Sequence, residues 1–183
     1  MSKEPFRLVA IDPGSSTLGI SVLEYNLDGN KFKLIHAETF KVNAKDAKHR
    51  SVVAIHGDRT VRLMILRDLI LETLNEYQPH AIVAESSYMG RFANAFATLV
   101  ECMAMIRSAM YSYDPFMLLY MVDPTTVKTN VGMKRIKGTT KEDVKNALLK
   151  SNKVQWNDTD PNDLDEHSID AIAVGCWYMD NVV

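Results

Sequence analysis

An aspartate that directly follows an apolar strand-like run constrains this chain more than any other feature. Asp12 ends the run Leu8–Ile11 and is followed at once by Pro13 and Gly14. These two residues turn the chain sharply and leave little steric bulk beside the carboxylate. A carboxylate against a buried strand is normally paired, hydrogen-bonded or bound to a cation. The motif therefore predicts a polar site at the end of a strand.

Two further segments supply side chains of the same kind. Glu85 ends a second short apolar run, 80–84, and His167 and Asp170 are three positions apart in a predicted helix. Residues at this spacing share one face of a helix. Carboxylates that lie close together repel one another unless a cation or protons intervene. We therefore expect Asp12, Glu85, His167 and Asp170 to form a cation site.

The donor types indicate which cation and which chemistry. Mg²⁺ and Mn²⁺ favour oxygen ligands, and two such ions about 4 Å apart can activate water and stabilise the leaving oxygen of a phosphodiester. A histidine ligand is unusual for Mg²⁺ and easier for Mn²⁺, so His167 alternatively orients the attacking water or moves protons. A lone histidine would be interpreted as a core or capping residue, but its spacing to Asp170 and the two other acids favours a functional one.

Length and composition indicate one ordinary domain. The chain has 183 residues, of which 46% are hydrophobic and 24% charged, as in water-soluble globular proteins. No apolar stretch approaches the roughly 20 residues that span a bilayer, and the N-terminus does not resemble a signal peptide. We expect a single domain over 1–183 in the cytoplasm, with no membrane association. Cys102 and Cys176 are then expected to stay unpaired in a reducing compartment.

Charge is distributed unevenly along the chain. The formal net charge is −2, yet residues 120–153 contain eight basic and three acidic residues, and residues 41–67 contain seven basic and two acidic ones. Residues 154–183 contain seven acids and no lysine or arginine. A polyanion could lie on the basic regions while cations collect at the acids. Charge alone supports equally well the interpretation that these are solvated helix faces.

Hydrophobic periodicity predicts an α/β fold. The expected strands are 6–11, 17–25, 31–41, 80–85 and 116–122, and the expected helices are 58–77, 91–112, 125–131, 139–149 and 164–179. A hairpin turn is expected at Asp28–Gly29, and the basic segment 43–50 is expected to be a loop. The order predicts a mixed five-stranded sheet, with three antiparallel strands and then parallel ones, covered by helices on both faces.

In this order and at this separation, the three motifs resemble those of RuvC-type Holliday junction resolvases, in the ribonuclease H-like superfamily. The matching segments are Ile11–Gly14 with Gly19, Val83–Glu85, and His167–Ala173. The resemblance implies a ribonuclease H-like nuclease domain with two Mg²⁺ or Mn²⁺ ions in each active site. The catalytic metal ligands that it implies are Asp12, Glu85, His167 and Asp170.

The resemblance extends to the middle of the chain. Asp123–Lys128 is followed by a basic, glycine-containing loop and then by Thr140–Val144. Family lysines at these places contact or neutralise the scissile region, which makes Lys128 a candidate for DNA binding and Lys141 a candidate for both DNA binding and catalysis. The full set of expected DNA-binding residues is Lys128, Lys134, Arg135, Lys137, Lys141, Tyr88 and Arg91.

The chain also departs from the family pattern. The family carries, after strand four, an aromatic residue that stacks into the junction; Tyr88 and Phe92 are the candidates here, although Phe92 also fits an apolar helix stripe. The expected Gln-x-x-Gly along that helix is replaced by Glu101–Ala104, and the segment 43–55 is long and basic. These departures are typical of a divergent branch, such as a phage or viral member acting in a bacterial cell or a phage-infected host.

The resemblance predicts a metal-dependent, structure-selective endodeoxyribonuclease that cuts four-way (Holliday) DNA junctions. Paired, symmetric cleavage needs two active sites related by a dyad, so we expect a homodimer. The alternative is a nuclease of the same fold that acts on RNA, flaps or replication intermediates. A nucleotide-binding protein of the actin and sugar-kinase type needs a second phosphate loop, for which 183 residues leave no room. A non-catalytic DNA-binding module is disfavoured because all four ligand positions are filled.

Overall fold

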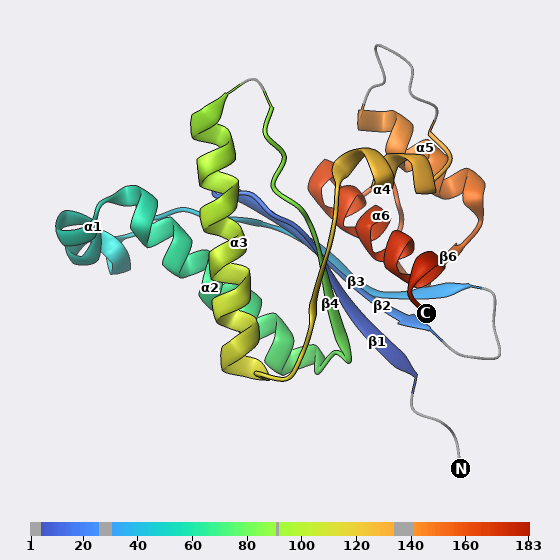
Figure 1. The fold of residues 1–183 in the computed structure, drawn as a ribbon, viewed down its shortest axis with the longest axis horizontal. Coiled ribbons are helices and arrows are strands. Elements are labelled where there is room, and N and C mark those ends of the chain that lie inside the picture. Colours follow the sequence, from blue (N-terminus) through green and yellow to red (C-terminus); the bar gives the residue numbers. More distant parts are fainter. Residues whose placement is uncertain (1–4, 26–30, 91, 134–140) are drawn as a thin grey trace.

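The centre of the structure is a mixed sheet of six strands in the order β5-β4-β1-β2-β3-β6 (Figure 1). This computed structural model describes residues 5–25, 31–90, 92–133 and 141–183, with the side chains of the last range described from 143 onward. Strands β1 to β3 are antiparallel, whereas β4 and β5 run parallel to β1 and β6 runs parallel to β3. The strands are β1 (Phe6–Asp12), β2 (Thr17–Tyr25), β3 (Phe32–Lys41), β4 (Ala81–Glu85), β5 (Leu119–Val122) and β6 (Val154–Gln155).

Helices cover both faces of this sheet (Figure 1). Helices α2 and α3 pack on one face, and α4, α5 and α6 lie on the other. The helices are α1 (Arg50–His56), α2 (Asp58–Tyr77), α3 (Ala93–Tyr113), α4 (Pro124–Asn130), α5 (Lys141–Ser151) and α6 (Glu166–Asn181), with a short 3₁₀ helix at Ala47–His49. Among the described residues, no helix combines the length and apolar character that crossing a membrane requires.

Strand β1 is buried on both sides, which explains why its sequence is continuously apolar rather than alternating. Leu8 and Ala10 pack into the core beneath α6, whereas Val9 and Ile11 pack into the core beneath α2 and α3. All four are fully buried. The central strand that carries Asp12 at its end is therefore held from both faces.

Helix α6 lies unusually close to the sheet because two glycines leave room for it. A β-carbon on Gly175 would lie 2.4 Å from a methyl group of Leu23 and 3.2 Å from the β-carbon of Ala10. A β-carbon on Gly19 of β2 would lie 2.2 Å from the carbonyl oxygen of His167. The second approach is to backbone, which cannot move aside as a side-chain methyl can. Gly19 thus allows the first turn of α6 to rest directly on β2.

The predicted fold class is confirmed, but the sheet has six strands rather than the predicted five. The additional strand, β6, pairs with β3 through Phe32 and Val154. It is only two residues long, so it carries no periodicity that a sequence pattern could reveal. Its existence depends on β3 being present as a template at the edge of the sheet.

The expected helices are shifted by one or two residues at most of their ends, and two segments differ more from expectation. The segment 43–50, expected to be a loop, contains the 3₁₀ helix and the first residue of α1. The fifth strand begins at Leu119 instead of 116, because Asp114 accepts a hydrogen bond from the backbone N–H of Phe116 at 2.9 Å and turns the chain there. Phe116 is 92% exposed as a result. The expected Asp28–Gly29 hairpin turn lies outside the described residues.

Substitution of Gly175 by Val is expected to destabilise the fold by about 1–3 kcal/mol, because overpacking forces side chains and backbone apart between α6 and the sheet. Thermal or urea unfolding monitored by circular dichroism measures the change. Ala97→Val, at an exposed position of α3, is the matched control and should cost only about 0.5 kcal/mol of helix propensity. Equal stability losses in the two variants would contradict the close packing at Gly175.

Candidate active site

The carboxylates of β1 and β4 end side by side at one edge of the sheet. Ile11 is paired with Ala84 in the parallel register, so Asp12 and Glu85 occupy the next positions on neighbouring strands. Glu85 is in turn paired with Val122, the last residue of β5. The carboxyl ends of parallel strands are where ligand sites form in α/β sheets. The predicted juxtaposition of Asp12 and Glu85 therefore follows from the observed strand order.

Helix α6 brings its first turn to the same place. His167 Nδ1 lies 2.8 Å from Asp12 Oδ2, and Nε2 lies 3.1 Å from Thr17 Oγ1. Because a carboxylate only accepts hydrogen bonds, the Nδ1–H donates to Asp12. That hydrogen bond is the main cause that raises the pKa of His167 above its ordinary value, against the opposing effect of burial. The imidazole is thus held between the two strands that flank the Asp12 turn.

The remaining carboxylates are half-buried and repel one another. Burial, together with the negative charges of Asp12 and Asp170, raises the pKa of Glu85 from 4.5 to about 8. Burial and the charge of Asp12 likewise raise the pKa of Asp170 from 3.8 to about 6. Asp12, Glu85 and Asp170 therefore form one electrostatically coupled group.

One lysine partly offsets this negative charge. The ammonium group of Lys128, on α4, opposes the rise in the pKa of both Glu85 and Asp170. Asp123 lies in the same neighbourhood, but it caps α4 by accepting the backbone N–H groups of Thr125 and Thr126 at 3.0 Å each. The hydrogen bond from the Thr126 hydroxyl is the main cause that lowers the pKa of Asp123. The carboxylate of Asp123 therefore serves as the N-terminal cap of α4. Lys128, on the same helix, lies close enough for its charge to act on Glu85 and Asp170.

The chemistry of this donor set fits a divalent cation, although the side chains are not arranged around one. Within the described part of the chain, no three or more His, Cys, Asp or Glu side chains converge as metal ligands. A hard cation would relieve the repulsion that raises the pKa values of Glu85 and Asp170. It would also compete with His167 for the oxygen of Asp12. The fit rests on coupled, partly buried carboxylates at one sheet edge.

The predicted DNA-binding residues are only partly covered by the structure. Tyr88 is 63% exposed in the connection between β4 and α3. Phe92 is 69% exposed and immediately precedes α3, so it does not belong to the buried stripe of that helix. Lys141 begins α5, but its side chain is outside the description. Also outside the described residues are Arg91, Lys134, Arg135 and Lys137.

Two neighbours of His167 were not anticipated from the sequence. Thr17 bonds its Nε2, and Glu166 Oε1 lies 3.5 Å from the same atom. Glu166 directly precedes His167 in the sequence, but its proximity to Nε2 of that histidine could not be predicted from the pattern. Thr17 is the first residue of β2 and shows no pattern beyond following the turn of Asp12. Only the approach of α6 to β2 identifies it.

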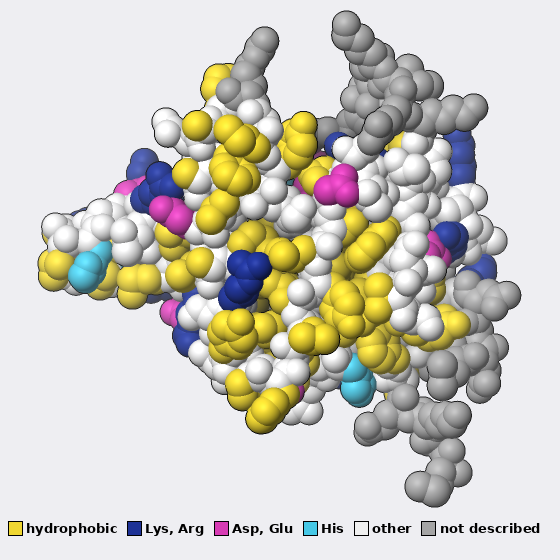
Figure 2. All heavy atoms as spheres, viewed as in Figure 1, with side chains coloured by type: hydrophobic (Ala, Val, Ile, Leu, Met, Phe, Trp, Pro, Cys, Tyr) yellow, Lys and Arg dark blue, Asp and Glu magenta, His cyan; other side chains and the backbone are white. Residues whose placement is uncertain are grey.

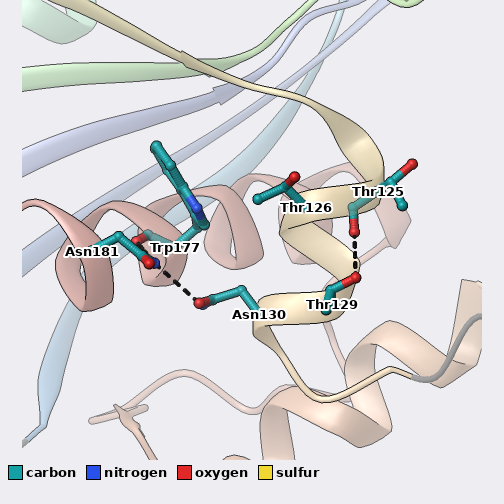
Figure 3. A pocket seen from close by; sticks show the side chains of 6 residues that line it. All are labelled: Thr125, Thr126, Thr129, Asn130, Trp177 and Asn181. Carbon is teal, nitrogen blue, oxygen red and sulfur yellow. Dashed lines mark hydrogen bonds between the residues drawn. The ribbon is translucent and has the colours of Figure 1, made fainter.

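A polar pocket of about 240 Å³ lies elsewhere, between α4 and the C-terminal half of α6 (Figure 3). The Trp177 ring stands at one side of it, and the amide of Asn181 donates to Asn130 at 3.1 Å. Three threonines complete its lining: Thr125, Thr126 and Thr129. The described residues that line the pocket include no carboxylate, histidine or cysteine, so they offer neither an acidic or imidazole metal ligand nor a general base. It is separate from the candidate active site.

Comparisons with solved structures identify the class of fold. RuvC of Thermus thermophilus in complex with a Holliday junction substrate aligns with a TM-score of 0.70 and 20% identity, covering 95% of this chain and 92% of that one. The yeast mitochondrial Holliday junction resolvase aligns at 0.64 with 13% identity, covering 95% and 78%. The Fowlpox virus resolvase aligns at 0.57 with 13% identity, covering 97% and 100%. No protein-family model and no curated protein sequence matches the chain.

The chain therefore has the ribonuclease H-like fold of Holliday junction resolvases over nearly its whole length. Within that class its fold is similar to that of RuvC, at 19–20% sequence identity. The resemblance noted in the sequence is thus confirmed at the level of the fold.

In metal-free buffer, the stability of the protein is expected to fall as the pH rises from about 4.5 to about 8. Between the ordinary pKa of 4.5 and the raised pKa of about 8, the folded protein keeps a proton on Glu85 that the unfolded chain has released. Raising the pH through this window therefore favours unfolding. Glu85→Gln removes this contribution and should flatten the decline, as measured by urea unfolding at several pH values with a chelator present.

Glu72→Gln provides the matched control, because Glu72 is exposed on α2 and outside the site. It should reproduce the pH dependence of the wild type. If the stability of Glu85→Gln falls with pH as steeply as that of the wild type, Glu85 is not the carboxylate whose raised pKa causes the decline.

Proposed function

We propose that this protein is a metal-dependent, structure-selective endodeoxyribonuclease that resolves four-way DNA junctions by paired phosphodiester hydrolysis. The observation that carries the proposal is the coupled group of Asp12, Glu85 and Asp170 at the carboxyl end of the sheet, in a fold similar to that of junction resolvases. Such a concentration of buried negative charge is costly for folding unless a bound cation offsets it.

The carboxylates are assigned to metal binding. Asp12, Glu85 and Asp170, with His167, would hold two Mg²⁺ or Mn²⁺ ions, which supply an activated water and stabilise the leaving oxygen. Burial of Glu85 and Asp170 positions their oxygens and limits competition from bulk water. Asp12 directly follows four fully buried strand residues, so it has little freedom to move away from its neighbours.

His167 is assigned a second role, in proton transfer, and two lysines are assigned to neutralise phosphate charge. The imidazole of His167 is oriented by Asp12 on one nitrogen and by Thr17 on the other. This geometry suits an imidazole that carries a proton at Nδ1 and donates it to Asp12 when the metal is absent. A bound metal ion would take the place of that proton as the partner of the Asp12 oxygen. Lys128 is suited to neutralise charge on a phosphate beside the carboxylates. Lys141 is proposed for the same task.

Junction recognition is assigned to two exposed aromatic rings and to four basic residues outside the described part of the chain. Tyr88 and Phe92 expose their rings at the rim formed by the β4–α3 connection, where an unpaired base could stack. Arg91, Lys134, Arg135 and Lys137 are proposed to bind phosphates without reading sequence. Two opposed cuts require two sites related by a dyad, so a homodimer is proposed as the acting form.

Asp12→Asn is expected to lower the cleavage rate by about 10³-fold or more while junction binding is retained, because Asp12 is assigned to metal and not to DNA. Cleavage is measured on an immobile four-way junction and binding by gel shift in a chelator. Without DNA, a metal ion at about 100 times its Kd stabilises the wild type by about 2.7 kcal/mol. Thermal unfolding with Mn²⁺ should show this stabilisation in the wild type and little of it in Asp12→Asn.

Asp158→Asn is the matched control, because Asp158 is exposed in the turn after β6. It should cleave and bind metal as the wild type does. If Asp12→Asn cleaved the junction in Mg²⁺ at the rate of the wild type, the assignment of the site would be contradicted.

The substrate is tested by comparing a four-way junction, a flap, a replication-fork substrate and an RNA–DNA hybrid under the same conditions. The proposal expects the junction to be cut fastest, by paired and opposed nicks that ligase can seal. Faster cleavage of the hybrid or the flap would assign the same active site to another nucleic acid target. No cleavage of any substrate with Mg²⁺ or Mn²⁺ would contradict nuclease activity itself.

A further inference from the structure

We propose that Lys41 and Lys45 form a phosphate-binding strip that holds the DNA backbone on the β3 side of the candidate active site. The inference rests on the proposed nuclease function and names a part of the surface that holds its substrate. It is carried by the position and the unpaired charge of these two lysines and by the orientation of Lys41.

The strip begins beside the catalytic turn. Lys41, the last residue of β3, is paired with Thr17, whose hydroxyl contacts His167 at 3.1 Å. The next residue, Val42, donates its backbone N–H to the carbonyl oxygen of Ser16 at 2.9 Å. Ser16 belongs to the turn that follows Asp12. The segment is thus fastened by backbone pairing to the same turn that carries the candidate catalytic aspartate.

The side chain of Lys41 is directed to the face on which the site lies. Thr39, two positions earlier on β3, bonds Asp165 and Ser168 at the start of α6. Because alternate residues of a strand share one face, Lys41 projects to this side as well, beyond the end of α6. Val42 projects to the other side and is buried in the core with α2 and α3.

Burial alternates through the whole segment. Val42 and Ala44 are 4% and 1% exposed, whereas Lys41, Asn43 and Lys45 are exposed. The side chain of Asn43 also accepts the backbone N–H of Lys45 at 3.0 Å. Two buried anchors and one local hydrogen bond therefore hold the lysines in place, so less conformational entropy is lost when they bind a ligand.

These cations have no acidic partner within the described part of the chain, unlike two arginines of α2. Arg59 pairs with Glu101 at 2.7 Å, and Arg62 pairs with Asp58 at 3.0 Å. No such ion pair forms at Lys41 or Lys45. An ammonium group without a partner beside an acidic site is well suited to an external anion.

The ligand class follows from the arrangement. The residues 41–45 span at most about 13 Å, a length that several phosphates of one DNA strand cover at about 3.4 Å of rise each. Lys128 lies on the opposite flank of the carboxylates, since α4 follows β5 and the strip follows β3. A strand that crosses the carboxylates would thus meet cations on both sides. A repeated polyanion fits this geometry better than a single small anion does.

The test compares two double variants with the same change of charge. Lys41→Gln with Lys45→Gln should weaken junction binding by about tenfold and lower the slope of log affinity against log salt by about two, because about one counterion is released for each phosphate contact. Lys33→Gln with Lys150→Gln is the control, since both lysines are exposed and outside the strip. Binding is measured by fluorescence anisotropy in a chelator over a range of salt, so that cleavage does not interfere.

The outcomes separate this proposal from the proposed function. Junction binding and cleavage by the wild type, with the same salt slope in both double variants, would overturn the strip and leave the nuclease assignment intact. A change of oligomeric state without a change in DNA affinity would make the segment a protein interface and also overturn the strip. A wild type that neither binds nor cleaves any nucleic acid would overturn both proposals.

A crosslinking experiment locates the contact directly. Cys102 and Cys176 are both free and buried, so a cysteine introduced at an exposed position can be labelled selectively. Lys45→Cys that carries a photoactivated crosslinker should attach to the DNA strand within a few nucleotides of the cut. Lys33→Cys with the same label should give no such product. Equal crosslinking from both positions, or none from Lys45→Cys, would contradict the strip.

Discussion

The close approach of α6 to the sheet is the constraint on which the rest of this structure depends. Gly19 leaves no side chain between β2 and the backbone of His167, and Gly175 allows the middle of the helix to settle against Leu23 and Ala10. Because the helix rests this low, its first turn reaches the ends of β1 and β4. A larger residue at Gly19 would lift that turn and separate His167 from Asp12. The geometry of the site therefore depends directly on how closely α6 packs on the sheet.

Without a bound cation, the carboxylates of the site destabilise the folded protein. Glu85 and Asp170 are largely buried, and their raised pKa values show that their charged forms are disfavoured in place. The hydrogen bond from His167 to Asp12 and the charge of Lys128 offset only part of this repulsion. The burial of apolar strand residues around the site stabilises the fold and offsets the remaining repulsion between the carboxylates. An arrangement of this kind is expected at a functional site and has no value for stability.

The surface around the site divides into regions of different character. Figure 2 shows apolar side chains gathered over the face that carries the edge strand β5, where Met121 is 46% exposed and Leu118 is 68% exposed. Cations instead flank the carboxylates, with Lys128 on the β5 side and the strip on the β3 side. The similarity to junction resolvases lies in the fold, at 20% identity or less in the structures compared above.

The sequence by itself determined the fold class and the segments that supply the site, because apolar periodicity and the Asp12–Pro13–Gly14 turn are local signals. The antiparallel strands, the long helices and the ends of β1 and β4 all follow from patterns within a few residues. Tertiary structure alone decided the sixth strand, the contact of Thr17 with His167 and the exposure of Phe92. A two-residue strand needs β3 as its template, and Thr17 meets His167 only because α6 docks on β2. Contacts between residues 150 positions apart leave no mark on local pattern, since they depend on which surfaces pack together.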